Sequence, residues 1–136
     1  MKKLVLTATL LLLASQTFAA CVGDIDDLPP GLKPAFHLNH LIGKALNEQS
    51  GGDQQNGGLC QAQGFTATQS RILVYRVYSA RNRAFGRCWS FAEPTGTKAS
   101  YADANAICPE RNDLDRLMVC QLTVNAPVVV GTGAKA

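Results

Sequence analysis

The chain lacks the glycine-rich strings that bind nucleotide phosphates in the common α/β domains. Neither G-x-x-x-x-G-K-[ST] nor G-x-G-x-x-G occurs among its 136 residues, which excludes a P-loop and a Rossmann unit. Charged residues make up only 17% of the chain, and the formal net charge of +3 does not by itself point to a class of partner. A length of 136 residues corresponds to one domain and excludes a multidomain enzyme.

Histidine is also scarce, and its positions argue against two kinds of site. The two histidines, His37 and His40, precede Cys88, whereas papain-like proteases, which Gly86–Phe91 superficially resembles, have their histidine far downstream of the nucleophile. Cys88 is therefore predicted to be a disulfide partner. His37 and His40 have the spacing of two ligands on one helix face, but no third ligand follows within a turn. We expect a solvated polar face there and no metal site.

The first nineteen residues predict a secretory signal peptide. Two lysines precede an apolar stretch over residues 4–14 that is too short to span a bilayer, and small residues stand three and one before a cut after Ala19. We therefore expect the protein to be secreted or periplasmic. Residues 20–33 are expected to form an extended arm, and residues 34–136 a single domain.

All five cysteines lie in the part of the chain that would be exported, where disulfides form and persist. An odd number leaves one cysteine outside the intramolecular pairs. Cys21 is the candidate, either as a lipid anchor or as a free or intermolecular thiol. The other four are expected to form two bridges that staple loops to the sheet. The sequence permits three pairings, of which we favour Cys88–Cys120 together with Cys60–Cys108.

The remaining pattern predicts a disulfide-stabilised α+β domain with a small mixed or antiparallel sheet and one or two packed helices. The strongest strand signal covers residues 70–79, which are rich in β-branched and aromatic side chains. The other expected elements are, in chain order, an amphipathic helix over 35–48 with Pro34 as its first residue, a loop over 49–64, a short strand over 88–92, a helix capped by Ser100 and bounded by Pro109, and strands over 117–124 and 128–130.

Arginine is concentrated in and after the best strand. Five of the seven arginines fall within 17 residues: Arg71, Arg76, Arg81, Arg83 and Arg87. Forked guanidinium donors suit phosphate or carboxylate recognition, and a near-neutral domain fits a dinucleotide such as NAD, or an anionic face of a protein target, better than a nucleic acid. The alternative is a basic face that contacts only solvent. Arg76 stands among apolar residues of the strand. We expect it either to reach an edge or to point into a cleft that binds an anion.

A further pattern runs from Val74–Tyr78, through Gly86 near the end of the next loop, to Trp89–Pro94. It resembles the ADP-ribosyltransferase-type domains of secreted bacterial polymorphic toxins, and the likeness covers residues 71–131. In that class the first strand has an arginine that grips the phosphate side of NAD. A later strand has a Ser/Thr motif that shapes the nicotinamide pocket.

The resemblance implies that Arg76 and Trp89 bind NAD as a co-substrate and that Ser90 is the catalytic residue of the middle motif. The family's late glutamate, which polarises the ribose as the oxocarbenium ion forms, has no counterpart. After Ser90 the glutamates are Glu93 and Glu110, and neither falls on a late strand. Because electrostatic stabilisation is usually the largest catalytic term, we expect a shortened domain that binds NAD and transfers poorly. If active, it would be an NAD-dependent ADP-ribosyltransferase or NAD glycohydrolase.

The alternative is a non-enzymatic binding or inhibitor module, secreted or periplasmic, that uses the arginine-rich loop over residues 81–87 as its contact surface. Topology discriminates between the two interpretations. The NAD-binding domain requires Arg76 and Ser90 to line one cleft between adjacent strands, whereas the binding module is indifferent to where these residues point.

Overall fold

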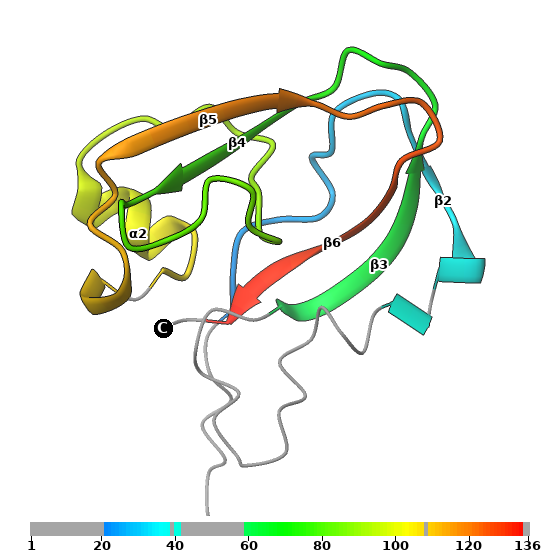
Figure 1. Cartoon of the computed structure of the whole chain (residues 1–136). Coiled ribbons are helices and arrows are strands. Elements are labelled where there is room, and N and C mark those ends of the chain that lie inside the picture. Colours follow the sequence, from blue (N-terminus) through cyan, green and yellow to red (C-terminus); the bar gives the residue numbers. More distant parts are fainter. Residues whose placement is uncertain (1–20, 39, 42–58, 108, 135–136) are drawn as a thin grey trace, which may run out of the picture.

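The computed structural model describes residues 21–38, 40–41, 59–107 and 109–134 (Figure 1). The predicted signal peptide and most of the helix predicted over residues 35–48 lie outside these ranges. No helix within them is both long enough and apolar enough to cross a membrane.

The described residues form two antiparallel sheets, so the single small sheet expected from the sequence is wrong. The larger sheet has the strand order β1-β6-β3-β2 and the smaller one pairs β4 with β5. The strands are β1 (Cys21–Val22), β2 (Leu32–Pro34), β3 (Leu59–Ala67), β4 (Leu73–Tyr78), β5 (Arg116–Gln121) and β6 (Pro127–Ala134). The chain is thus mostly sheet and belongs only broadly to the α+β class.

The two sheets meet where the segment from β3 to β4 runs beside the segment from β5 to β6. Leu122 N–H donates to Ile72 O at 2.9 Å, and Asn125 N–H donates to Ala67 O at 2.8 Å. From this junction the β4–β5 pair and the β3–β6 pair diverge in Figure 1. Ala67 and Ile72 are both buried, so the junction also holds part of the small core.

The helical elements with defined bounds are short: η1 (Phe36–Leu38), α2 (Lys98–Ala104) and η2 (Pro109–Arg111). Residues 40–41 are also helical. The N-cap of α2 is Thr97, not Ser100 as predicted. Thr97 Oγ1 accepts the Ser100 N–H at 3.1 Å, and Ser100 Oγ accepts the Thr97 N–H at 3.0 Å. Ser100 is therefore the third-residue partner of a capping box, and the helix starts earlier than its sequence signal suggested.

Strands β4, β5 and β6 confirm three predicted strands with shifted bounds. The strand predicted over residues 88–92 is reduced to one bridge between Ser90 and Tyr75. Pro34 ends β2 instead of starting a helix, so the predicted extended arm leads into the larger sheet.

Strand β3 includes residues 59–64, which we predicted to be loop. The residues of β3 favour a strand only weakly. The strand forms because β2 and β6 pair with it on its two sides and supply its backbone hydrogen bonds. Gly64 lies against Leu38 and Ala35, and Ala35 N–H donates to Gly64 O at 2.9 Å. The missing side chain at Gly64 allows this close approach.

Cys88 and Cys120 are free thiols, so the predicted disulfide between them is wrong. Ser90, two residues after Cys88, pairs with Tyr75 on one side of β4. Cys120 pairs with Val74 on the other side. Two strand spacings amount to about 9.5 Å, which exceeds the Cα separation of about 7 Å that a disulfide tolerates. This sheet is held by hydrogen bonds and packing, without the covalent staple expected from the sequence.

The remaining cysteine predictions concern the bridge between Cys60 and Cys108 and the state of Cys21. The side chain of Cys60 and all of Cys108 lie outside the described part of the chain, and so does the bridge predicted between them. Cys21 is disulfide-bonded. This state differs from a lipid anchor and from a free thiol, two of the three alternatives expected for Cys21.

Candidate functional site

The predicted site residues Arg76, Trp89 and Ser90 line one hollow of about 130 Å³. We call it the Arg76 hollow. It is lined by ten residues: Tyr75, Arg76, Val77, Cys88, Trp89, Ser90, Tyr101, Asn105, Ile107 and Asn112. Arg76 is the only one of the ten with a formal charge at neutral pH. The walls come from β4, from the segment that follows the arginine-rich loop, from α2 and from the residues after α2.

A backbone bridge fixes the position of Ser90 and Trp89 beside β4. Ser90 N–H donates to Tyr75 O and Tyr75 N–H donates to Ser90 O, both at 2.8 Å. The indole Nε1–H of Trp89 donates to Gly86 O at 2.8 Å. The segment that carries the middle motif of the predicted site is thus held on the edge of β4 that β5 leaves open.

Arg76 is half-buried and donates to two backbone carbonyls of the loop that follows β4. Its Nε–H donates to Arg83 O at 3.3 Å, and its Nη1 donates to Cys88 O at 2.9 Å. Among the described residues, no carboxylate pairs with Arg76, and its Nη2 amino group forms no hydrogen bond. Two carbonyls satisfy part of the guanidinium but do not neutralise it. The hollow therefore favours an anion.

Gly86 packs directly against the guanidinium of Arg76. A Cβ at position 86 would overlap the guanidinium carbon and both terminal nitrogens of Arg76. Only glycine lets the loop lie this close to the arginine. Gly86, which the resemblance to the toxin domains included, therefore has a local structural reason to be glycine.

The hydroxyl of Ser90 is occupied by its own turn. Ser90 Oγ accepts the Ala92 N–H at 3.1 Å and lies 3.4 Å from Ala92 O, to which it donates. Serine hydroxyls commonly form this kind of turn two residues on. Ser90 thus contributes a wall of the hollow, and the catalytic role that the resemblance assigned to it stays a prediction.

Sequence reasoning missed four of the lining residues: Tyr101, Asn105, Ile107 and Asn112. Tyr101 and Asn105 are four residues apart, the spacing that places two side chains on one helix face, and this signal could have paired them. The side chains of Asn105 and Asn112 both donate to backbone carbonyls, Asn105 to Tyr101 O at 2.9 Å and Asn112 to Val77 O at 3.3 Å.

Tyr101 is the only described residue whose acidity clearly departs from its ordinary value. Burial raises the pKa of its phenol above the usual 10.0, while the backbone of Val77 and the positive charge of Arg76 act in the opposite direction. The phenol therefore keeps its proton at neutral pH. It can donate a hydrogen bond to an anion in the hollow.

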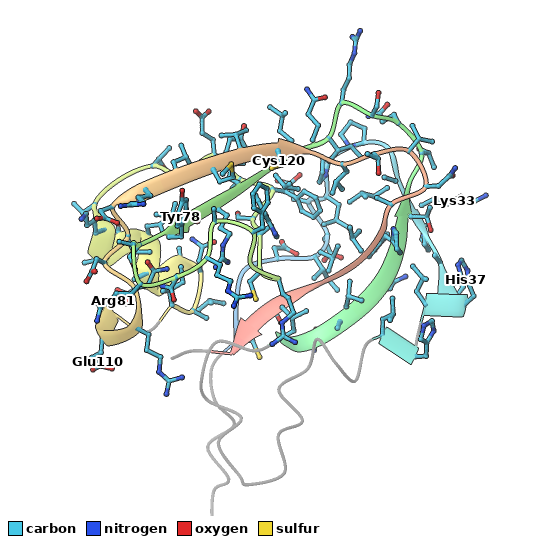
Figure 2. All side chains as sticks on the ribbon, viewed as in Figure 1. Lys33, His37, Tyr78, Arg81, Glu110 and Cys120 are labelled. Atoms are coloured by element: carbon cyan, nitrogen blue, oxygen red, sulfur yellow. The ribbon has the colours of Figure 1, made fainter. Side chains whose placement is uncertain are left out.

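The arginine-rich loop is only partly available for binding. Arg81 forms a two-pronged pair with Asp113, with Nη2 to Oδ1 at 2.5 Å and Nε to Oδ2 at 3.2 Å. It also donates to Glu110 O at 3.4 Å, and Figure 2 shows Arg81 and Glu110 at the same end of the molecule. Arg83 and Arg87 are exposed and form no ion pair within the described ranges. They are the free cations of this loop.

The two histidines lie apart from the hollow. Both are exposed, and His40 Nδ1 lies 3.1 Å from His37 O. Figure 2 shows His37 at the opposite end of the molecule from Arg81 and Glu110. Where the chain is described, no three His, Cys, Asp or Glu side chains gather as they would to hold a metal ion.

Comparisons with known proteins do not extend this picture. No family model, no curated protein and no solved structure matches the chain. The likeness to the toxin domains is therefore supported only by the sequence motifs quoted above. The geometry of the Arg76 hollow is the structural feature that supports a proposed function.

Proposed function

We propose that this chain is an exported NAD-binding domain of the ADP-ribosyltransferase-like kind. The observation that carries the proposal is the convergence of Arg76, Trp89 and Ser90 in one hollow whose only charged lining residue is Arg76. The unpaired Nη2 of Arg76 suits a phosphate of NAD, and the protonated phenol of Tyr101 offers a second donor. The rings of Trp89 and Tyr101 suit a flat aromatic group such as nicotinamide.

The size of the hollow limits how much of NAD it can hold. Pockets that enclose a drug-sized ligand measure about 300–1,000 Å³. The Arg76 hollow measures about 130 Å³. It accommodates one end of the dinucleotide, and the remainder must lie on the surface outside it.

The chemistry of NAD cleavage predicts that binding exceeds turnover. When the bond between ribose C1′ and the nicotinamide nitrogen breaks, its electron pair stays with nicotinamide and positive charge develops on the ribose. A carboxylate would stabilise that charge, but none of the ten lining residues is acidic. Any hydrolysis by water, which would give nicotinamide, ADP-ribose and a proton, is expected to be slow.

Isothermal titration calorimetry of residues 20–136 with NAD tests the proposal. Arg76→Gln should weaken binding about tenfold or more because it removes a charge-assisted bond. Arg71→Gln is the matched control, since Arg71 is exposed and lies outside the hollow. Arg76 also holds the loop, so Tyr101→Phe serves as a second variant, which removes the phenol hydroxyl and leaves Arg76 in place. Circular dichroism reports whether each variant is folded.

Two results would contradict the proposal. One is a wild-type chain that does not bind millimolar NAD. The other is an affinity for NAD that both Arg76→Gln and Tyr101→Phe leave unchanged. Chromatographic assay of released nicotinamide measures turnover separately, so weak catalysis does not count against binding.

A second candidate is the non-enzymatic binding module, and the exposed, unpaired Arg83 and Arg87 favour it. On this interpretation the loop binds an acidic face of a protein target. Poly-L-glutamate is a simple probe of that chemistry. Binding of this polymer that is lost in Arg83→Gln/Arg87→Gln, in a chain that does not bind NAD, would support the module over the NAD-binding domain.

A further inference from the structure

Residues 83–87, which we call the tip of the arginine-rich loop, present an aromatic ring to solvent between two arginines. Phe85 is 77% exposed, more than any other large hydrophobic residue in the described part of the chain. Arg83 and Arg87, two residues before and after it, are also exposed. Single exposed apolar residues are normal on protein surfaces, and what distinguishes Phe85 is the exposed arginine two residues to either side of it.

Side chains of Arg76 and Trp89 hydrogen-bond to the backbone of the tip and fix its position, so the exposure of Phe85 does not come from an unsupported loop. Arg76 donates to the carbonyls of Arg83 and Cys88, which bracket the tip. Trp89 Nε1–H donates to the carbonyl of Gly86, which follows Phe85. The backbone is thus tied at the start of the tip, within it and directly after it. Arg76 acts here as a positioning residue for the loop in addition to lining the hollow.

The chemistry of the tip fits a ligand that carries both an aromatic ring and phosphates. A phenyl ring stacks on a nucleobase of any identity, and guanidinium groups form forked hydrogen bonds with phosphate oxygens. Arg83 and Arg87 form no ion pair within the described ranges, in contrast to Arg81, which Asp113 neutralises. The two free cations therefore flank the ring without competing carboxylates.

The tip also adjoins the Arg76 hollow. Cys88, at the end of the loop, lines the hollow, and Gly86 packs on the guanidinium of Arg76. A ligand with one end in the hollow can therefore continue across the loop. Because the hollow accommodates only one end of NAD, the other end needs a surface of this kind.

We propose that Arg83, Phe85 and Arg87 form the subsite for the adenosine diphosphate half of NAD. Phe85 stacks on the adenine, and Arg83 and Arg87 bind the pyrophosphate. This inference rests on the proposed function and adds to it the part of the ligand that the hollow cannot hold. It also gives the arginine-rich loop a role within the same site.

Calorimetric titration with ADP, nicotinamide mononucleotide and NAD separates the two halves of the ligand. Phe85→Ala should weaken ADP and NAD binding about tenfold, as expected for loss of one stacked base, and leave the mononucleotide unchanged. Phe36→Ala is the matched control, because Phe36 is 72% exposed and lies in η1, away from the hollow. It should leave the affinity for all three ligands unchanged.

The arginines are tested in the same way with a charge-matched pair of double variants. Arg83→Gln/Arg87→Gln should weaken ADP binding and flatten its dependence on salt, because phosphate contacts are screened. Arg71→Gln/Arg116→Gln removes the same charge from exposed positions outside the hollow and should change neither quantity.

The outcomes separate this inference from the proposed function. The subsite is refuted if the wild-type chain does not bind ADP, or if Phe85→Ala binds ADP as the wild type does. The proposed function fails, and the subsite stands as a nucleotide site, if ADP binds through Phe85 while neither NAD nor the mononucleotide shows any contribution from the nicotinamide half.

Discussion

Replacement of Gly86 by alanine should destabilise the protein through one side chain, that of Arg76. The added Cβ would overlap the guanidinium, which must then swing away. That movement breaks its bonds to Arg83 O at 3.3 Å and to Cys88 O at 2.9 Å. The backbone itself should tolerate alanine, since φ at Gly86 lies outside the left-handed region where side chains are strained.

The magnitude follows from the two hydrogen bonds. A bond to a charged group contributes about 1.5–3 kcal/mol, and for a half-buried arginine we take about 1 kcal/mol each, or about 2 kcal/mol together. Replacing glycine by alanine returns about 0.5 kcal/mol by restricting the unfolded chain. Gly86→Ala should therefore lower the free energy of unfolding by about 1.5 kcal/mol. In an Arg76→Ala background the obstacle is absent, and the same change should stabilise the chain by about 0.5 kcal/mol.

Urea denaturation followed by tryptophan fluorescence measures all four proteins of this cycle. Trp89 is the only tryptophan in the chain and is bonded to Gly86 O, so its emission reports on this loop. The expected coupling energy is about 2 kcal/mol. If Gly86→Ala destabilises the Arg76→Ala protein as much as the wild type, the cost of a side chain at position 86 does not come from its contact with Arg76. That result would refute the prediction.

Three further predictions concern other parts of the molecule. Because the pKa of Tyr101 is raised above 10.0 in the folded state, its contribution to stability is fully present below about pH 10 and is lost at higher pH. Urea denaturation between pH 8 and 11 should show an alkaline loss that is smaller in Tyr101→Phe, and identical profiles would contradict this. In the native protein iodoacetamide should label exposed Cys88 faster than half-buried Cys120, as followed by peptide mass spectrometry; equal rates would count against the described burial. Gly131→Ala should destabilise the chain by about 2–3 kcal/mol, because its Cβ would overlap Gln61 O in the backbone of β3, which cannot rotate aside. A thermal shift of less than 1 °C would contradict this last expectation.

The sequence predicts those strands whose own side chains favour extended backbone. β4 and β6 are rich in valine and other residues that fit a pleated surface, and both were expected near their observed positions. β3 contains glutamine, alanine and glycine, and it becomes a strand because it pairs on both sides. That cause lies in other segments and leaves no periodic signal in β3 itself. The division into two sheets also depends on pairing between distant segments, so the sequence does not predict it.

The candidate site likewise contains residues that the sequence identifies and residues that only the fold brings together. A lone arginine in an apolar strand is a strong local anomaly, and this anomaly identifies Arg76 as a candidate site residue from the sequence alone. The contribution of Tyr101 and Asn112 depends on how α2 and the segment after it fold back on β4, which no local pattern encodes. The pairing of Cys88 with Cys120 failed for a related reason. Proximity in the same sheet does not suffice when an intervening strand separates two thiols.

The pairing of the strands has a consequence for how the chain folds. β4 and β5 are nested, in sequence, inside β3 and β6. Closing the inner pair brings the adjoining ends of the outer two together, so the outer strands can then zip up without a second large loss of chain entropy. We expect the β4–β5 ladder to form before the β3–β6 ladder. Both require contacts between distant parts of the chain, which places the folding time in the slow, millisecond-to-second class.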